Sequence, residues 1–176
     1  MANRAAIREL QTRLATRLQA ARTQGVLVSW LAVRAGGANY LFPLVQSGEI
    51  FPLGNLQRVP YCNGWFAGVL NLRGGLFGVV DLAAFIAQGK VPQRSEHAMS
   101  EASVVTLHTA LEVNCALMVD SLAGLRNTDA FAESSGPQPD SPSYFGNRYI
   151  EPAGTVWQEI NLQTLSQLSS FLSISA

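Results

Sequence analysis

Residues 68–82, Gly-Val-Leu-Asn-Leu-Arg-Gly-Gly-Leu-Phe-Gly-Val-Val-Asp-Leu, limit the possible folds of this chain more than any other stretch. Two short runs of β-prone apolar residues, 69–72 and 76–80, flank a pair of glycines. A two-residue reversal between antiparallel strands needs positive φ angles, which glycine adopts without steric cost. The pattern therefore predicts a β-hairpin whose turn is formed by Gly74 and Gly75.

A short helix is expected directly after the hairpin. Asp81 precedes the apolar run 82–86, and an Asp carboxylate at such a position accepts hydrogen bonds from the first free amides of a helix. The arrangement recurs near the end of the chain, where Asn161 follows a predicted strand and precedes the helical pattern of residues 162–172. This internal repeat of strand, cap and helix predicts two lobes of similar construction.

The rest of the chain is predicted to be mainly β. Gly36 and Gly37 favour a turn between two apolar strands, and Pro43 either ends the second strand or lies on a sheet edge. Two polar, breaker-rich stretches, 89–100 and 133–143, are expected to be connections, the latter a mobile surface loop. The other predicted strands share alternating or continuous apolar character and cover 26–33, 40–42, 44–51, 102–108, 111–119, 121–125, 144–150 and 155–160.

Composition narrows the class of protein. The 176 residues are 48% hydrophobic and 14% charged, which suits one well-buried domain or two small lobes that share a core. No apolar run approaches the roughly 20 residues of a membrane-spanning helix, and no apolar export signal is expected at the N-terminus. The two cysteines, Cys62 and Cys115, fit a reducing cytoplasm and not a disulfide scaffold.

Charge is distributed unevenly although the formal net charge is zero. Residues 1–25 contain five arginines and one acid, Glu9, and so carry +4, whereas the other 7 bases and 11 acids carry −4. An acidic body argues against sequence-independent nucleic-acid binding, which depends on neutralising phosphates.

Residues 4–23 predict an amphipathic helix with an apolar stripe between flanking arginines. The stripe can pack on the body, mediate self-association or dock on a partner helix. Because it lacks Trp and Phe, attachment to a membrane is the least favoured use. The residues of the stripe are Ile7, Leu10, Leu14, Leu18 and Ala21.

No catalytic or metal-binding motif is found. The sequence has no phosphate-binding glycine loop, no H-E-x-x-H and no G-x-S-x-G. A nucleophilic set could combine Cys115 or Cys62 with His108 and Asp120, since such residues need only meet in space. Cys115, however, is better interpreted as a small buried hydrophobe, and Asp120 is expected to face water or cap a turn. We therefore expect no enzyme, no metal and no cofactor.

The hairpin also resembles the signature of a known family. Asn-x-Arg-Gly at 71–74, followed by Val-Val-Asp-Leu at 79–82, is similar to the pattern of CheW-like domains. The resemblance covers about residues 26–172. Trp-Phe at 65–66 and Trp157 make the chain more similar to the type IV pilus-associated homologues called PilI than to flagellar coupling proteins.

The resemblance implies a mainly β fold of two small SH3-like β-barrels that share a hydrophobic seam. The expected organisation is an N-terminal amphipathic helix over residues 1–24 and a CheW-like domain over residues 25–173. Short helices are expected after residues 81 and 161.

The family also implies a function, that of a non-enzymatic adaptor in bacterial chemosensory signalling. The implied partners are the cytoplasmic tip of a methyl-accepting chemoreceptor and the CheW-like regulatory domain of a CheA-type histidine kinase, with no nucleic acid and no direct membrane insertion. The finer resemblance implies a cytoplasmic protein recruited to receptor arrays that control twitching motility. A flagellar or other chemosensory pathway is an alternative. A β-barrel that binds nucleic acid and a small hydrolase are alternatives of other classes.

Glu49, Gly68 and Arg73 are the candidate partner-binding residues. The resemblance implies that Glu49 and Arg73 form an opposed pair near the partner-binding surface. Such a pair can also be an ordinary surface salt bridge, worth about 0 to 1 kcal/mol, but an arginine beside glycines at a hairpin tip can donate in several directions. A side chain at Gly68 would push a docked surface away, although glycine there can equally serve barrel packing.

Overall fold

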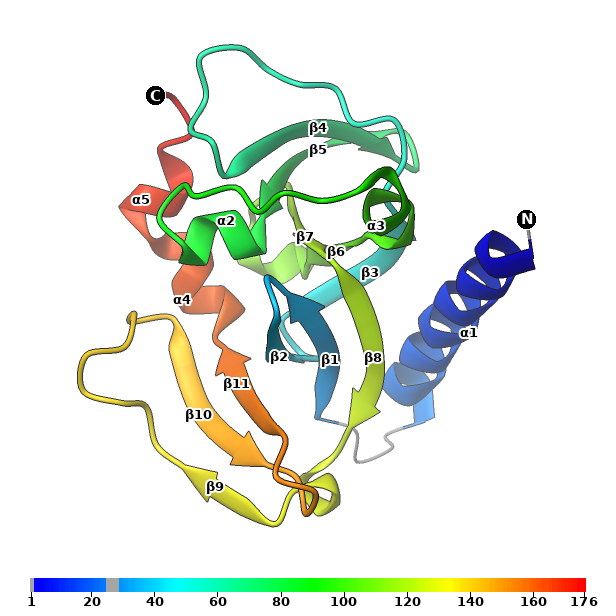
Figure 1. The fold of residues 1–176 in the computed structure, drawn as a ribbon, viewed down its shortest axis with the longest axis vertical. Helices are drawn as coiled ribbons and strands as arrows, with labels where there is room; N and C mark the ends of the chain where they lie inside the picture. Colours follow the sequence, from blue (N-terminus) through cyan, green and yellow to red (C-terminus); the bar gives the residue numbers. More distant parts are fainter. Residues whose placement is uncertain (1, 25–28) are drawn as a thin grey trace.

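The computed structural model describes residues 2–24 and 29–176. Figure 1 shows two β-lobes, one above the other, with a long helix, α1 (Ala2–Gln24), lying beside them. No helix in the described part of the chain is long and apolar enough to cross a membrane.

The lower lobe in Figure 1 is a six-stranded sheet with the order β8-β1-β2-β11-β10-β9. Neighbouring strands are antiparallel except β2 and β11, which run parallel. Its strands are β1 (Trp30–Ala35), β2 (Ala38–Pro43), β8 (Ser121–Arg126), β9 (Glu133–Ser135), β10 (Phe145–Ile150) and β11 (Val156–Ile160).

The upper lobe is a five-stranded sheet with the order β3-β6-β7-β5-β4, in which β5 and β7 are parallel. Beyond β3, a bridge between Gln57 and Val69 links the chain to β4, so the two edges of this sheet approach each other. The two sheets confirm the predicted mainly β, two-lobed fold. The strands are β3 (Ser47–Pro52), β4 (Phe66–Leu72), β5 (Gly75–Asp81), β6 (Ser103–Leu107) and β7 (Cys115–Val119).

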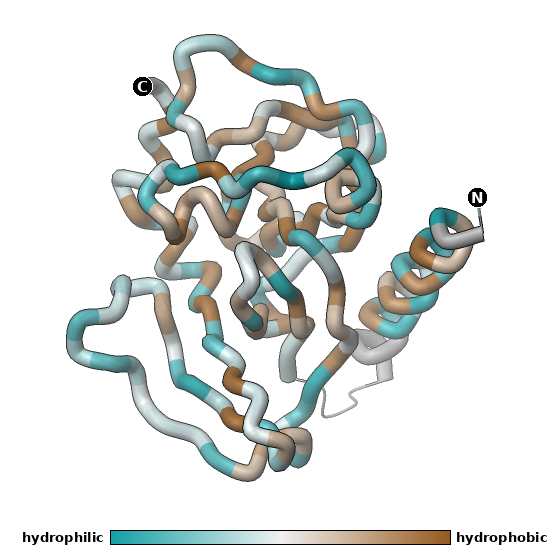
Figure 2. The backbone as a smooth tube through the Cα atoms, viewed as in Figure 1, coloured by the Kyte–Doolittle hydropathy of each residue, from teal (hydrophilic) through white to brown (hydrophobic). Residues whose placement is uncertain are grey.

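The largest hydrophobic cluster is shared by both lobes, and each lobe also has a smaller cluster of its own. The shared cluster combines Leu31 and Phe42 of the six-stranded sheet with Val105 and Leu117 of the five-stranded sheet, all fully buried. Figure 2 shows hydrophobic stretches along the strands in the middle of the molecule, whereas the long connections are mostly hydrophilic or neutral. The strands β6 and β7 are buried at every position, as expected for strands that are covered on both faces. Because the lobes share this core, we expect them to behave as one rigid body.

The β4–β5 hairpin is confirmed, but its turn begins one residue earlier than predicted. Leu72 pairs with Gly75, so the turn residues are Arg73, with φ +50°, and Gly74, with φ +79°. Two positive φ angles define the turn that matches the twist of a hairpin. The side chain of Asn71 accepts a hydrogen bond from the Gly74 amide at 3.0 Å and thereby holds the turn. Arg73 consequently stands at the tip, although left-handed backbone costs a non-glycine residue roughly 1–2 kcal/mol.

Both predicted helix caps are confirmed. Asp81 and Asn161 each accept a hydrogen bond from the amide three residues further on, at 3.3 Å and 2.9 Å. The single helix expected at the end of the chain is instead two, because Leu168 adopts an extended ψ of 129° between them. The helices are α2 (Leu82–Ile86), α4 (Leu162–Gln167) and α5 (Ser169–Leu172).

Both predicted connections contain regular structure. Residues 89–100 include most of a short helix, α3 (Glu96–Glu101), which Ser95 caps by accepting a hydrogen bond from the Ala98 amide at 3.1 Å. Residues 133–143 begin with β9, an exposed edge strand that, among the described strands, pairs with β10 alone. Helix α3 was not predicted because it is too short to show apolar periodicity. Strand β9 was not predicted because backbone pairing holds it in place and it has no apolar face.

The N-terminal helix packs back on the body, against β3 and β8. Leu14 and Leu18 are buried, and buried Gln11 donates a hydrogen bond to Ser103 Oγ at 2.7 Å. Leu10, expected within the stripe, is 51% exposed, because the buried face includes Gln11 instead. The side chain of Ala21 and residues 25–28 lie outside the described part, so the division at residue 24 stays a prediction.

Candidate functional site

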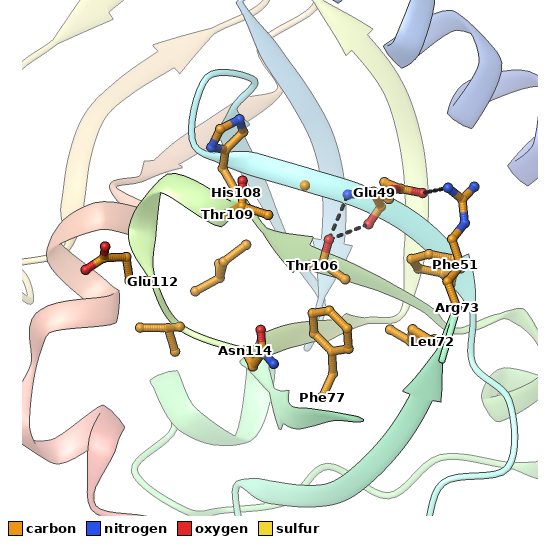
Figure 3. Close-up of a pocket in the computed structure, with 13 residues that line it drawn as sticks. Glu49, Phe51, Leu72, Arg73, Phe77, Thr106, His108, Thr109, Glu112 and Asn114 are labelled. Atoms are coloured by element: carbon orange, nitrogen blue, oxygen red, sulfur yellow. Dashed lines mark hydrogen bonds and ion pairs between the residues drawn. The ribbon is translucent and has the colours of Figure 1, made fainter. Parts of the chain in front are cut away.

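The two charged candidates meet in space. Arg73 Nη1 lies 3.0 Å from Glu49 Oε2, with the side chains 74% and 43% exposed, respectively. Arg73 comes from the tip of the β4–β5 hairpin and Glu49 from β3, so the pair joins the two edges of the five-stranded sheet (Figure 3). An ion pair this exposed contributes about 0–1 kcal/mol to stability. Its two charges remain accessible to a partner.

Local contacts fix the position of the pair. Thr106 Oγ1 accepts a hydrogen bond from the Glu49 amide at 2.7 Å, and the Arg73 guanidinium lies 5.7 Å from the centre of the Phe51 ring. At Gly48, a Cβ atom would lie 2.1 Å from Thr106 Oγ1, so only glycine allows β3 to approach β6 this closely. The sequence reasoning missed this role of Gly48, because it depends on a residue more than 50 positions away.

A groove of about 470 Å³ lies beside the ion pair. Phe51, Leu72 and Phe77 supply apolar surface within it, and polar side chains stand around them (Figure 3). Apolar area surrounded by polar groups is the usual anatomy of a protein–protein contact. The polar side chains include those of Glu49, Arg73, Thr106, His108, Glu112 and Asn114.

Gly68, the third candidate, has a clear packing role. Its φ is +143°, and a Cβ atom would lie 2.2 Å from the carbonyl oxygen of Gln57. The neighbouring Val69 amide donates a hydrogen bond to that same oxygen at 2.8 Å. Glycine therefore allows the chain that leaves β3 to lie on β4. A contact of Gly68 with a partner stays a prediction.

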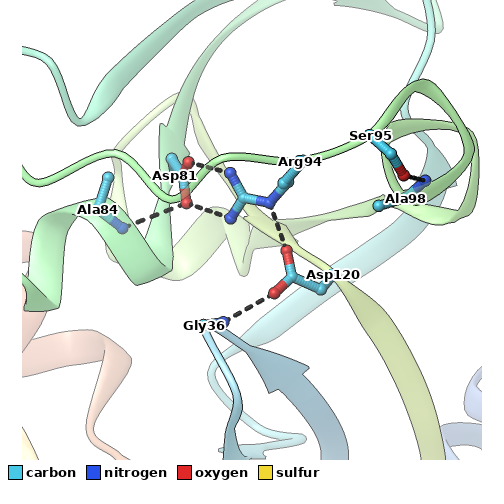
Figure 4. Close-up of polar contacts among 7 residues, drawn as sticks. All are labelled: Gly36, Asp81, Ala84, Arg94, Ser95, Ala98 and Asp120. Carbon is cyan, nitrogen blue, oxygen red and sulfur yellow. Dashed lines mark hydrogen bonds and ion pairs between the residues drawn. The ribbon is translucent and has the colours of Figure 1, made fainter.

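A buried ionic cluster was not foreseen from the sequence. The terminal nitrogens of Arg94 donate to both carboxylate oxygens of Asp81, at 2.6 Å and 2.9 Å, and its Nε donates to Asp120 at 2.6 Å (Figure 4). Asp120 also accepts a hydrogen bond from the Gly36 amide, in the β1–β2 turn of the other lobe, at 2.7 Å. Asp120, expected to face water or cap a turn, thus binds a turn and an arginine together.

The cluster keeps Arg94 charged. Burial lowers the pKa of Arg94, but the hydrogen bonds and negative charges of Asp81 and Asp120 outweigh burial and raise the pKa above its ordinary value. Arg94 lies in a polar connection that looked solvated in the sequence, and no local pattern marks it as buried. We conclude that the cluster ties the connection, the α2 cap and the β1–β2 turn together.

The residues of the possible nucleophilic set make other contacts, Cys62 through its Sγ with the carbonyl oxygen of Pro60 at 3.7 Å. Burial raises the pKa of the Cys115 thiol to about 12, so this sulfur is not a thiolate at neutral pH. His108 Nδ1 accepts a hydrogen bond from the Ala110 amide, and Asp120 binds Arg94. Within residues 2–24 and 29–176, no three His, Cys, Asp or Glu side chains are grouped so that they could hold a metal ion.

Comparison with known proteins identifies the class to which this fold belongs. The family model of the CheW-like domain matches residues 29–169, so the chain belongs to the CheW-like domain family, a family of coupling adaptors. Among individual proteins, Protein PilI of Pseudomonas aeruginosa is 30% identical over 118 residues, which are 65% of this chain and 63% of PilI. The match thus spans less than two thirds of that relative. These findings confirm the resemblance noted in the sequence.

A solved structure agrees with the fold. The crystal structure of scaffolding protein TtCheW from Thermoanaerobacter tengcongensis matches with a TM-score of 0.63 at 14% identity, covering 82% of this chain and 95% of TtCheW. Helix α1 lies before the residues that the family model matches.

Proposed function

We propose that this protein is a non-enzymatic adaptor that couples chemoreceptors to a CheA-type histidine kinase. Membership of the CheW-like family is the observation that carries the proposal. An exposed ion pair beside a partly apolar groove supports it, because both features suit a reversible protein contact.

A rigid body is what such an adaptor needs. The lobes share one core, and the Arg94 cluster holds the β1–β2 turn of one lobe to the α2 cap of the other. A partner that docks on one lobe is then held at a fixed position relative to a partner on the other. Through this connection, small movements of the receptor would bias the activity of the kinase.

The similarity to PilI supports a pathway that controls type IV pilus twitching motility. In that pathway the protein would be cytoplasmic and recruited to receptor arrays at the membrane. A flagellar or other chemosensory pathway is the alternative, and the two differ in which receptor and kinase from the same cell are bound.

Glu49 and Arg73 are the residues proposed to contact a partner. The proposal rests on their exposure and on the position of Arg73 at a hairpin tip, where the turn requires a positive φ that glycine would adopt at lower cost than arginine. Gly68 would act indirectly, by allowing the chain near Gln57 to lie flat beside this surface.

Titration tests the proposal. Wild type and Arg73→Glu are titrated against the CheW-like regulatory domain of the kinase and against the cytoplasmic tip of the receptor. We expect saturable binding by wild type and at least about tenfold weaker binding of one partner by the variant, since charge reversal removes an attraction and adds a repulsion. Circular dichroism verifies that the variant is folded.

A charge swap provides the control. Glu49→Arg combined with Arg73→Glu restores an ion pair in the opposite orientation. If the pair serves only the fold, the swap restores binding; if Arg73 itself contacts the partner, binding stays weak. A folded wild type that binds neither partner would contradict the proposed function.

A further inference from the structure

A second hollow, which we call the loop pocket, opens on the five-stranded lobe. It lies between the chain that joins β3 to β4 and the connection 89–95, which both cross the upper lobe in Figure 1. Its volume is about 480 Å³, and neither Glu49 nor Arg73 lines it, so it is separate from the proposed partner site. The residues that line it include Leu56, Arg58, Val59, Val91, Met99 and Met118.

The wall of the loop pocket is apolar and reaches the interior of the lobe. Met118 belongs to the hydrophobic cluster of the five-stranded lobe, and Leu56 and Met99 pack against this cluster. Met118 is only 3% exposed and lies in β7, a strand that is buried at every position. The pocket therefore leads from the surface into the end of a small β-structure, which is a common place for a small ligand.

The apolar wall can adapt to a ligand. Helix α3 buries none of its residues, and Met99 is the side chain by which it lines the pocket. Methionine side chains are unbranched and rearrange at low cost. Met99 and Met118 can thus make room for a narrow alkyl chain.

The mouth of the loop pocket combines exposed apolar surface with positive charge. Val59 and Val91 line the pocket and are 40% and 53% exposed, so folding alone leaves apolar surface in water here. Arg58 also lines the pocket, is exposed, and makes no ion pair with any residue of the described chain. Lys90, exposed beside Val91, adds a second positive charge. The mouth is therefore complementary to an anion that carries an apolar group.

The floor of the pocket determines how such an anion would lie. Asp81 lines the floor, and both its carboxylate oxygens accept hydrogen bonds from Arg94. Together with Asp120, this cluster carries one net negative charge and repels an anion. The charged end of a ligand must therefore stay at the mouth beside Arg58, and its apolar end must be short enough to stop before the cluster.

We propose that the loop pocket binds an alkyl carboxylate, with the carboxylate beside Arg58 and the tail between Met99 and Met118. The ligand is a small amphipathic anion and not a macromolecule. This inference goes beyond the adaptor function and does not depend on it, because the two sites share no residue.

A series of ligands tests the orientation. The full chain is titrated by calorimetry with hexanoate, octanoate and decanoate, each below the concentration at which it forms micelles. We expect the affinity to rise up to about fourfold for each CH₂ group that reaches the apolar wall, and to stop rising once the tail meets the ionic cluster. Octyltrimethylammonium, with the same tail and the opposite charge, should bind at least about tenfold more weakly than octanoate.

Charge variants test the role of Arg58. At about 50 mM salt we expect Arg58→Glu to weaken octanoate binding about tenfold, and at about 300 mM salt to weaken it less. Arg58→Lys should keep most of the affinity. Arg8→Glu is the matched control, because Arg8 is equally exposed but lies on α1, which contributes no residue to the pocket. Far-UV circular dichroism checks that all variants are folded.

The thiol of Cys62 reports where the ligand binds. Cys62 lines the loop pocket and is half-buried, whereas Cys115 is buried in the shared core. We expect saturating octanoate to slow the alkylation of Cys62 by iodoacetamide at least about threefold, because the tail covers the pocket.

The outcomes decide the assignment. It is wrong if octanoate shows no saturable binding up to about 10 mM, or if octyltrimethylammonium binds as tightly. Equal weakening by Arg58→Glu and Arg8→Glu would overturn it in favour of a general charge effect. If octanoate binds while Cys62 reacts at its free rate, the ligand lies elsewhere on the protein and the loop pocket is not its site.

Discussion

Replacing Arg94 by methionine should destabilise this protein far more than the loss of any exposed ion pair. The Arg94 side chain is 8% exposed and makes three hydrogen bonds to carboxylates, two to Asp81 and one to Asp120. Asp81 is itself only 3% exposed, so Arg94→Met leaves a buried carboxylate without its counter-charge. The methionine preserves much of the apolar volume and removes the charge.

The magnitude follows from this burial. Removing one member of a buried ion pair costs about 3–5 kcal/mol, because the remaining charge is left uncompensated. In a protein of this size each kcal/mol lowers the melting temperature by about 2–4 °C. Arg94→Met should therefore melt about 6–20 °C below wild type. Since the pKa of Arg94 is raised above its ordinary, already high value, the stabilisation that Arg94 provides should be unchanged across neutral pH.

Urea unfolding followed by circular dichroism measures the effect. Arg13→Met is the matched control, because its partner Glu9 and Arg13 itself are both well exposed, and we expect a loss within about 0.5 kcal/mol. Combining Arg94→Met with Asp81→Asn should cost less than the sum of the single changes, since no unpaired charge remains at residue 81. A loss of stability below about 1 kcal/mol for Arg94→Met would show that the buried carboxylate does not need its counter-charge. The same would follow if the losses of the two single variants simply added up in the double variant.

Two further predictions concern two glycines of the β4–β5 hairpin and the buried thiol of Cys115. Gly68→Ala should cost about 2–4 kcal/mol, because a Cβ atom would meet the Gln57 carbonyl at 2.2 Å, whereas Gly74→Ala, at positive φ in open space, should cost about 1–2 kcal/mol in urea unfolding. If both variants lost the same amount of stability, the expected clash with the Gln57 carbonyl would be refuted. Stability should fall as pH rises from about 9 to 12, because the pKa of Cys115 is about 12 in the fold against 9.0 ordinarily, and the unfolded thiol ionises first. The part of the slope due to Cys115, at most about 1.4 kcal/mol per pH unit, should be lost in Cys115→Ala between about pH 9 and 10, and an unaltered slope there would contradict this. Above about pH 10 the pKa values of Tyr40 and Tyr144, which burial also raises, add to the slope.

Features that depend on neighbouring residues could be predicted from the sequence. The hairpin was visible because β-prone runs flank its glycines, and the caps at Asp81 and Asn161 because each stands between a strand and a helix. The exact turn residues were not predicted, since Arg73 occupies a left-handed position that glycine usually takes.

Features that depend on distant residues could not be predicted. Nothing near Arg94 indicates that Asp120, 26 positions later, binds it. The need for glycine at residue 48 likewise arises from Thr106 on another strand. The pairing of Glu49 with Arg73 came from the family resemblance, because the residues between them contain no local pattern that brings the two together.

The order of strands has a consequence for synthesis in the cell. The five-stranded lobe is encoded without interruption by β3 to β7, but β2 of the other lobe must wait for its parallel partner β11, and the paired residues Tyr40 and Gln158 are 118 positions apart. At about 5–20 residues per second, a ribosome needs about 6–24 s to make that stretch. For this time the apolar side chains of β1 and β2 lack their final neighbours, and their open edge can join other chains. The six-stranded lobe, which is completed last, is thus the part of the chain that is most exposed to aggregation during synthesis.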